Sequence, residues 1–375
     1  MIIRFNTRLI SIEQNYPRKK REKLYIISFF LQTTSPYAHI PFHLQNVKVD
    51  SITMEANELM IIVGLIMFIL GSIGNLLSIY VFFMWSLSHS GPAGHRSNQT
   101  NNSPLYLFVS SIANLIIIIY ALLTRILFDG FNHTITTSNI FLLCKFRYFT
   151  LHTLDLISIV CFCLATFDRY LITSRSVQMR QRSTTKKKTM LIILGIIILF
   201  SLHSIPIGIY FNLTTTGQCV LNDPIYSYYY LFAFQVVLRG IIPIIVLSIL
   251  GPLTFRNLRI LQHQTHGHSN HDKQISRMLL FMSFAIVVSS IPYCIEQIYD
   301  VMFAQTSSGQ SSTPFLFHVI AMILFYTNPV FSFYIYFFST PNFRHQIQKM
   351  FHRNQHVFPV AHEQTHLPAS MHKIH

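Results

Sequence analysis

The stretch "PLYLFVSSIANLIIIIYALLTRILF", Pro104–Phe128, decides the fold class of this chain. It holds a single charged residue, Arg125, and it is longer than the roughly 20 apolar residues that a helix needs to cross a bilayer. In hydrocarbon every backbone polar group must be hydrogen-bonded within the protein, so such a run is predicted to be helical. Seven stretches of this kind follow one another: Met60–Met84, Pro104–Phe128, Cys144–Thr166, Met190–Tyr210, Tyr229–Leu253, Met278–Phe303 and Phe315–Phe338.

The composition agrees with an all-α membrane protein, a seven-transmembrane helix bundle. Hydrophobic residues make up 51% of the 375 residues and charged residues 11%, against about 25% charged residues in soluble domains. We assign residues 59–340 to the bundle and 341–375 to a cytoplasmic tail that begins with a short amphipathic helix. Residues 1–58 are expected to be an extracellular segment, either disordered or an over-extended gene model in which Met54 is the start.

Basic residues predict the orientation of the bundle, because Lys and Arg near span ends mark the cytoplasmic side. The loop after the third span, residues 168–188, holds seven of them, and the loops after the fourth and sixth spans hold none. We therefore expect a multi-pass plasma-membrane protein with its N-terminus outside. The net charge of +15 then faces the cytoplasm, where it favours contact with anionic lipid rather than nucleic acid.

Cysteines and glycosylation triplets fit this orientation. Cys144 opens the third span and Cys219 lies in the second outside loop, so both face the oxidising side and a disulfide between them is predicted. Asn132 in "NHT" and Asn212 in "NLT" also fall on outside loops and are candidate glycosylation sites.

The stretch "LATFDRYLITS", Leu164–Ser174, carries the clearest motif. Asp168, Arg169 and Tyr170 lie at the inner end of the third span, because 25 residues of helix after Cys144 rise about 37 Å.

An Asp-Arg-Tyr at the inner end of a third span, with a Cys at the outer end, resembles the rhodopsin-like G-protein-coupled receptors. Asn75 in the first span, Pro243 in the fifth and Pro292 in the sixth match the same family, and the resemblance extends over residues 57–352. It implies a receptor that binds an extracellular ligand and activates a heterotrimeric G protein. It implies no catalytic residues, no cofactor and no metal.

The last span, "YTNPVFSFYIYFFSTPNFR", departs from the family pattern. In the family an Asn-Pro-x-x-Tyr is followed by Phe-Arg seven residues after the Tyr. Counting back from Phe343–Arg344 places Tyr336 in the Tyr position and leaves the visible Asn328–Pro329 one turn further out. The alternative is a degraded motif in which Ser332 replaces the Tyr.

Other family positions have changed as well. The second-span Asp, which in the family helps to hold a sodium ion, is Asn114, and we expect the sodium site to have lost its charge. The sixth-span Trp is Ser290 and the fifth-span Tyr is Gly251. The remaining neutral groups of the expected sodium site are Ser158, Asn328 and Ser332.

The resemblance also implies an activation switch. Arg169 would be held in the resting state by Asp168 and by an acid at the inner end of the sixth span, where Asp272 lies 20 residues before Pro292. The alternative is that Asp272 is only a solvated acid in the first turn of a helix.

Two charged residues within spans predict the ligand site, because such charges are costly and usually functional. The resemblance implies that Asp155 and Arg239 line the ligand cavity from facing helices. Either they pair with each other there, or one of them binds the ligand. The alternative is a structural pair without a role in ligand binding. In the amine-binding receptors of the family an Asp lies one turn further out than Asp155. This chain has Leu151 at that position, which disfavours an amine ligand. A polar and aromatic rim favours a short peptide over a lipid: Arg125, Tyr229, Tyr230, Tyr293, Glu296, Gln297, Asp300 and His318.

Two further interpretations remain open. His263, His266, His268 and His271 would suit metal binding, but a flexible loop is the simpler interpretation. A seven-span transporter or channel-like protein without G-protein coupling is the alternative function, although the repeat symmetry of transporters is not found in the sequence.

Overall fold

The computed structural model describes residues 42–88, 102–131, 140–181, 184–213, 219–221, 223–264, 270–303 and 312–355. Within these ranges the side chains of residues 42–53, 177, 181, 261–264, 270–273, 300–303, 312–315 and 352–355 are not described. The chain divides into two units, Met1–Thr53 and Met54–His375, and the helix bundle belongs to the second.

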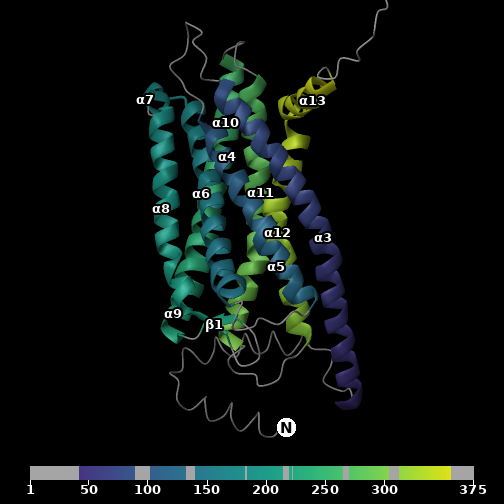
Figure 1. The fold of residues 1–375 in the computed structure, drawn as a ribbon. Coiled ribbons are helices and arrows are strands. Elements are labelled where there is room, and N and C mark those ends of the chain that lie inside the picture. The colour runs from purple at the N-terminus through teal and green to yellow at the C-terminus, as the bar shows by residue number, and fades with distance from the viewer. Residues whose placement is uncertain are drawn as a thin grey trace, which may run out of the picture. The chain divides into compact units, whose positions relative to one another are not determined.

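Seven helices in the described part of the chain are long and apolar enough to cross a membrane, which confirms the predicted fold class. Most of the long helices run in roughly one direction in Figure 1, and α3 (Phe42–Ser88) is tilted against them. The spans are Met54–Leu87, Ser103–Gly130, Phe141–Thr173, Lys186–Tyr210, Pro224–Ile260, Gln274–Tyr299 and Leu316–Ser339.

The elements from α3 to α8 form the first four spans and the connection between the third and fourth. Their bounds are α3 (Phe42–Ser88), α4 (Ser103–Ile116), η1 (Ile117–Leu122), α5 (Leu123–Arg125), η2 (Ile126–Gly130), η3 (Phe141–Phe146), α6 (Arg147–Thr173), α7 (Val177–Gln181) and α8 (Lys186–Tyr210). The remaining elements are β1 (Phe211–Leu213), β2 (Cys219–Leu221), α9 (Pro224–Tyr229), η4 (Tyr230–Ile241), α10 (Ile242–Gln264), α11 (Asn270–Phe303), α12 (Ser312–Ser339) and α13 (Pro341–Gln355).

Most helices extend beyond the apolar stretches that predicted them. The fifth span was predicted as Tyr229–Leu253, whereas it covers Pro224–Ile260. The helix α3 begins at Phe42, inside the segment assigned to the extracellular N-terminus. Hydropathy marks only the part of a helix that lies in hydrocarbon, and a helix continues past it wherever the backbone can still bond. The domain division at residue 59 stays a prediction, and residues 1–41 lie outside the description.

The η segments are turns of π-helix in the second, third and fifth spans. Their backbone bonds join residues five apart, so each segment changes the direction in which later side chains point. Arg125 lies between η1 and η2, and Arg239 lies in η4. Both arginines are therefore oriented by turns that a regular helical period does not describe.

The third span is the centre of the bundle and the fourth is its edge. In the most apolar window of each, 72% of the residues of the third span are buried, against 17% of those of the fourth. On α8 the side chains of Leu191, Leu199 and Ile209 are exposed, as expected for side chains that face lipid. Polar groups on α6 therefore lie where several helices can reach them.

The first and seventh spans approach closely at Gly74. A Cβ at this position would lie 2.8 Å from the Cβ of Phe333, so a larger residue would push α3 away from α12. Asn75 joins the two spans by a hydrogen bond. Its Nδ2 donates to the carbonyl oxygen of Pro329 on α12 (2.8 Å) and to that of Gly71 within α3 (2.9 Å).

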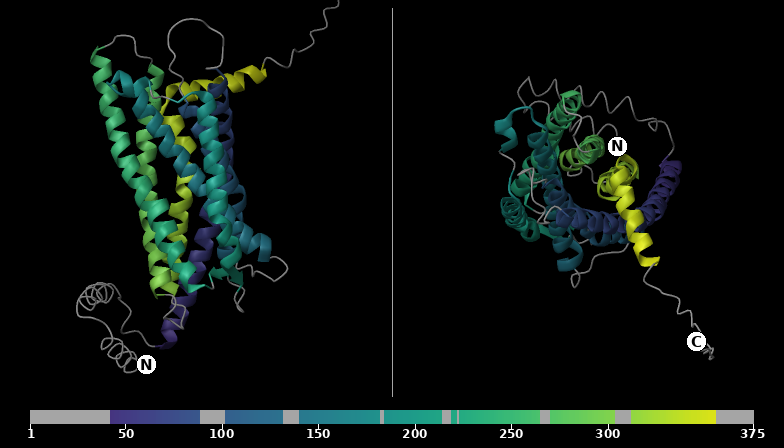
Figure 2. Two further views of the ribbon diagram at one scale, coloured as in Figure 1. Left: turned by 90° about the vertical axis from the view of Figure 1, so that its left-hand side faces the viewer. Right: turned by 90° about the horizontal axis from the view of Figure 1, so that it is seen from above.

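The helix α13 packs at the end of the bundle that is predicted to be the inner one. Figure 2 shows this helix lying across the direction of the spans, at the end of the molecule where Figure 1 places α7. Phe343 and Ile347 are buried, whereas Arg344 and Lys349 are exposed, so α13 is the predicted amphipathic helix. It packs its apolar face on the bundle and presents its basic face outward.

Candidate functional site

An ion pair joins the third and fifth spans near the centre of the bundle. Arg239 Nε bonds Asp155 Oδ2, and the two residues are 3% and 5% exposed. The Arg239 guanidinium carbon lies 4.2 Å from the ring centres of both Tyr293, on α11, and Phe325, on α12. Four spans therefore meet at one cation. Because both charges are buried, removing either one would leave the other without compensation.

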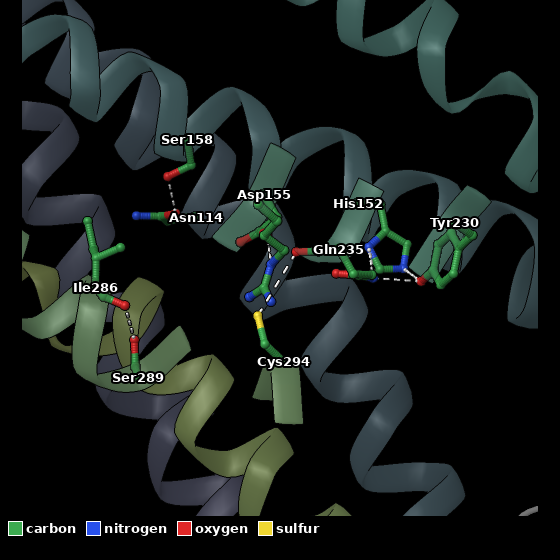
Figure 3. Close-up of polar contacts among 10 residues, drawn as sticks. Asn114, His152, Asp155, Ser158, Tyr230, Gln235, Ile286, Ser289 and Cys294 are labelled. Atoms are coloured by element: carbon green, nitrogen blue, oxygen red, sulfur yellow. Dashed lines mark hydrogen bonds and ion pairs between the residues drawn. The ribbon is translucent and has the colours of Figure 1, made fainter. Parts of the chain in front are cut away.

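A buried polar network lies about one turn outward of this pair (Figure 3). The Tyr230 hydroxyl is hydrogen-bonded to His152 Nε2, and Gln235 Nε2 donates to the same hydroxyl at 2.8 Å. His152 is 1% exposed and Gln235 is fully buried. The network holds η4 against α6. Because its polar groups are buried, each depends on the others for its hydrogen bonds.

A second charged cluster lies further out and joins the second, sixth and seventh spans. Arg125 Nε lies 2.6 Å from Asp129 Oδ2, and its Nη2 bonds His318 Nε2. A guanidinium only donates, so Nε2 accepts and the proton sits on Nδ1 of His318, which donates to Glu296 Oε1. Gln297 Nε2 donates to Glu296 Oε2 at 2.8 Å.

The structure thus brings the predicted ligand-site residues together in two groups. Asp155, Arg239 and Tyr293 form the inner group, and Arg125 and Gln297 belong to the outer cluster.

Other predicted rim residues behave differently. Tyr229 turns towards α8, where its hydroxyl lies 2.8 Å from His203 Nε2, so it does not share the buried network of Tyr230. His152, His203 and Gln235 were missed by sequence reasoning, because an isolated His or Gln within a span gives no pattern. The predicted side chains outside the described residues are Asn132, Asp272, Asp300, His263, His266, His268 and His271.

The outer end carries the predicted disulfide. Cys144 and Cys219 are bonded, with Cα atoms 5.7 Å apart, and Cys219 begins the strand β2 that pairs antiparallel with β1. The bond therefore fixes a hairpin to the outer end of the third span. Asn212 pairs with Val220 in this hairpin, and a glycan on it stays a prediction.

We expect Cys144→Ser and Cys219→Ser to reduce the thermal stability and surface level of the protein equally, with the double variant no worse than either. A disulfide is lost entirely when either sulfur is removed, so the effects cannot add. A typical loss is about 2–4 kcal/mol of unfolding free energy. Thermal unfolding of the three purified variants measures this, and additive losses would contradict a shared bond.

The region expected to correspond to a sodium site is only partly assembled. The Ser158 hydroxyl donates to Asn114 Oδ1 at 2.7 Å, and the Ser110 hydroxyl lies 2.8 Å from that of Ser158. Asn328 instead lines a cavity of about 290 Å³ between α11 and α12. Ser332 donates to the Pro329 carbonyl at 3.3 Å. Only Asn114 and Ser158 of the expected set are joined by a hydrogen bond.

At the inner end, Asp168 contacts the start of the second span. Its Oδ2 accepts from the Ser103 hydroxyl at 2.8 Å, and the backbone N–H groups of Asn102 and Ser103 also bond to it. The carboxylate therefore caps α4, where a negative charge is favourable. That Asp168 also holds Arg169 in the resting state stays a prediction.

Arg169 itself is fully buried, and Tyr170 beside it is half-buried. The contact of Arg169 with Asp272 stays a prediction, since the Asp272 side chain is not described. Two described hydrogen bonds join the sixth span to the corner between α12 and α13. Arg277 Nη2 donates to the Ser339 carbonyl at 3.1 Å, and Gln274 Oε1 accepts from the Asn342 backbone N–H at 3.0 Å.

Tyr336 lies at the same corner, 2% exposed. Its ring centre is 5.3 Å from that of Phe82 on α3 and 6.0 Å from that of Phe343 on α13. The ring contact between Tyr336 and Phe343 agrees with the spacing that placed Tyr336 in the motif position. A switch role for Tyr336 remains a proposal.

Three features set the class of protein: seven spans, a disulfide between the third span and the hairpin after the fourth span, and a buried Arg at the other end of the third span. The family model for the 7 transmembrane receptor (rhodopsin family) matches residues 93–336. That match covers more than half of the chain, so the chain belongs to the rhodopsin family of seven-transmembrane receptors. It is a multi-pass membrane receptor and not an enzyme. A comparison with curated proteins gives no match.

We expect the thermal stability of this receptor to be insensitive to sodium at constant ionic strength. A bound ion stabilises the folded state that binds it, but Asn114 provides no charge, its Oδ1 is engaged by Ser158, and Asp155 is bonded to Arg239. The measurement compares unfolding midpoints in sodium and in N-methyl-glucamine. The Asn114→Asp variant should gain a sodium-dependent rise, whereas such a rise in the unmodified receptor would show that another carboxylate holds the ion.

Proposed function

We propose that this protein is a cell-surface receptor that binds a short peptide at its outer end and activates a heterotrimeric G protein at its inner end. The proposal includes an extracellular N-terminus. The observation that carries it is the position of α11, which bears Tyr293, Glu296 and Gln297 near the outer end and Arg277 near the inner end.

The ligand would contact both the inner group and the outer cluster of charged residues. Arg239, paired with Asp155 and covered by Tyr293, would form the floor of the site, and Arg125 and Gln297 would belong to its rim. These residues offer cationic, anionic and aromatic contacts within a small region, which suits backbone and side-chain groups of a peptide better than a single acyl chain.

Activation would follow from the two attachments of α11. A ligand that competes for Glu296 or Tyr293 changes the outer contacts of this helix with α12. Its inner contacts, from Arg277 to the Ser339 carbonyl and from Asn342 to Gln274, are two hydrogen bonds that an outward movement must break. The ligand acts only through its different affinity for the two positions of α11.

The inner face would bind the G protein. Release of α11 would expose Arg169 from its buried position, with Asp168 keeping α4 in place and Tyr336 supporting the corner with α13. We include Asp272 in this switch as a partner that stabilises the resting position of Arg169.

The test uses the purified receptor in lipid nanodiscs with purified heterotrimers of the main Gα classes. We expect nucleotide exchange above that of empty nanodiscs, and a further increase with at least one fraction of a short-peptide library. Absence of exchange with every heterotrimer and every fraction, together with solute flux in receptor-containing liposomes, would overturn the proposal in favour of transport.

A further inference from the structure

Arg147 is a buried cation at the outer end of the third span. It is the first residue of α6 and is 3% exposed. Its guanidinium carbon lies 5.2 Å from the ring centre of Phe128 and 5.1 Å from that of Tyr148. The faces of the two rings attract the cation.

Among the acids whose side chains are described, none forms an ion pair with Arg147, and the Arg147 Nε is buried without a hydrogen-bond partner. A buried charge of this kind is costly unless something else in the functional state compensates it. Three described acids near the outer end are engaged by other groups: Asp129 by Arg125, Asp155 by Arg239, and Glu296 by His318.

A second buried donor without a partner faces the same region. Tyr326, on α12, is 1% exposed, and its hydroxyl has no hydrogen-bond partner among the described residues. Tyr326 belongs to one buried apolar cluster with Ile126, two residues before Phe128, and with Leu151, four residues after Arg147. Donors without hydrogen bonds on the third and seventh spans therefore lie in the same part of the bundle.

We propose that Arg147 and Tyr326 bind a carboxylate group of the receptor's ligand. A carboxylate presents two coplanar acceptor oxygens that match the fork of a guanidinium, and a tyrosine hydroxyl donates to a remaining lone pair. The rings of Phe128 and Tyr148 hold the guanidinium in place before the ligand arrives. This inference rests on the proposed function, because it specifies the chemistry of the ligand that the receptor recognises.

A purely structural Arg147 would behave differently from a binding residue. Its removal would destabilise the unliganded protein if the ring contacts outweighed the cost of burial. A residue kept for ligand binding leaves an uncompensated charge in the unliganded protein, so its removal should stabilise that state. We therefore expect Arg147→Gln to raise the unfolding midpoint of the unliganded receptor.

The binding test uses three small probes on the full-length receptor in nanodiscs: N-acetyl-phenylalanine, its neutral C-terminal amide, and octanoate. Ligand-observed NMR gives each affinity at matched ionic strength. We expect N-acetyl-phenylalanine to bind at least about tenfold more tightly than its amide, because a hydrogen bond to a charged group is lost in the amide. Arg147→Gln should remove this difference, and Tyr326→Phe should reduce it.

Arg175→Gln is the matched control, since it removes an exposed arginine at the opposite end of the third span and should leave the affinities unchanged. Arg147→Lys, which keeps the charge but not the fork, should recover part of the affinity. Three results would overturn the carboxylate site: acid and amide that both bind with equal affinity, acid binding that survives both Arg147→Gln and Tyr326→Phe, or no Arg147-dependent binding of either N-acetyl-phenylalanine or octanoate.

The probes also separate the two sources of a carboxylate. Arg147-dependent binding of N-acetyl-phenylalanine assigns the site to a peptide terminus or acidic side chain, whereas binding of octanoate alone supports the site but assigns it to an acyl chain. Basal nucleotide exchange, measured without probe, tests the proposed function separately. Acid binding without exchange would leave the site standing and refute G-protein coupling, and exchange without acid binding would do the reverse.

Discussion

Arg169→Ala should abolish receptor-stimulated nucleotide exchange while surface expression and the unfolding midpoint stay near those of the unmodified receptor. Arg169 is fully buried at the inner end of the third span. In the proposed mechanism its guanidinium must leave this position and meet the G protein, and alanine offers neither charge nor hydrogen bond for that contact. The measurement is nucleotide exchange at equal receptor concentration.

Arg175→Ala is the control for the loss of a positive charge on the inner face, because Arg175 is exposed and lies shortly after Arg169. This control variant should retain most of the exchange activity. Full exchange by the Arg169→Ala receptor would contradict the proposed coupling mechanism, whereas equal loss in both variants would point to a general electrostatic requirement.

Asp155→Ala should cost about 3–5 kcal/mol of unfolding free energy, because it leaves the buried Arg239 without its acid. Arg239 is 3% exposed, and its guanidinium carbon lies 4.2 Å from the ring centres of the neighbouring residues Tyr293 and Phe325, so water cannot easily replace the carboxylate. Thermal unfolding of the unliganded receptor in nanodiscs measures the loss.

The double variant Asp155→Leu with Arg239→Met is the decisive comparison. Replacing both charges by apolar groups removes the desolvation cost together with the attraction, so stability should return to that of the unmodified receptor or exceed it. Arg239→Lys should be intermediate, since lysine keeps the charge but lacks the planar group that stacks on the rings. Single variants as stable as the unmodified receptor would show that water reaches the pair.

If the pair belongs to the ligand site, the double variant separates stability from function. It should be folded and still fail to respond to a peptide that activates the unmodified receptor. A folded double variant with a full response would assign Asp155 and Arg239 a structural role alone. The outer cluster of Arg125, His318 and Glu296 would then carry ligand recognition without them.

Several features were predictable because the physics that determines them is local. The run Pro104–Phe128 had to be a helix wherever it lay in hydrocarbon, and the same holds for the other six spans. Cys144 and Cys219 shared the oxidising side of the membrane, which was enough to predict their bond. Asp155 and Arg239 were singled out because a charge within a span is costly and usually functional, although the sequence left open whether they pair with each other.

The sequence alone therefore determined the seven helices, the outer disulfide and the existence of a buried charged site, since hydropathy and charge are properties of each residue. Only the tertiary structure decided which groups meet: Asp168 with the start of α4, His152 with Tyr230, and Arg147 with the rings of Phe128 and Tyr148. Such pairings depend on how each helix is rotated about its axis. Turns of π-helix in the second, third and fifth spans change that rotation, and a regular helical period cannot reveal them.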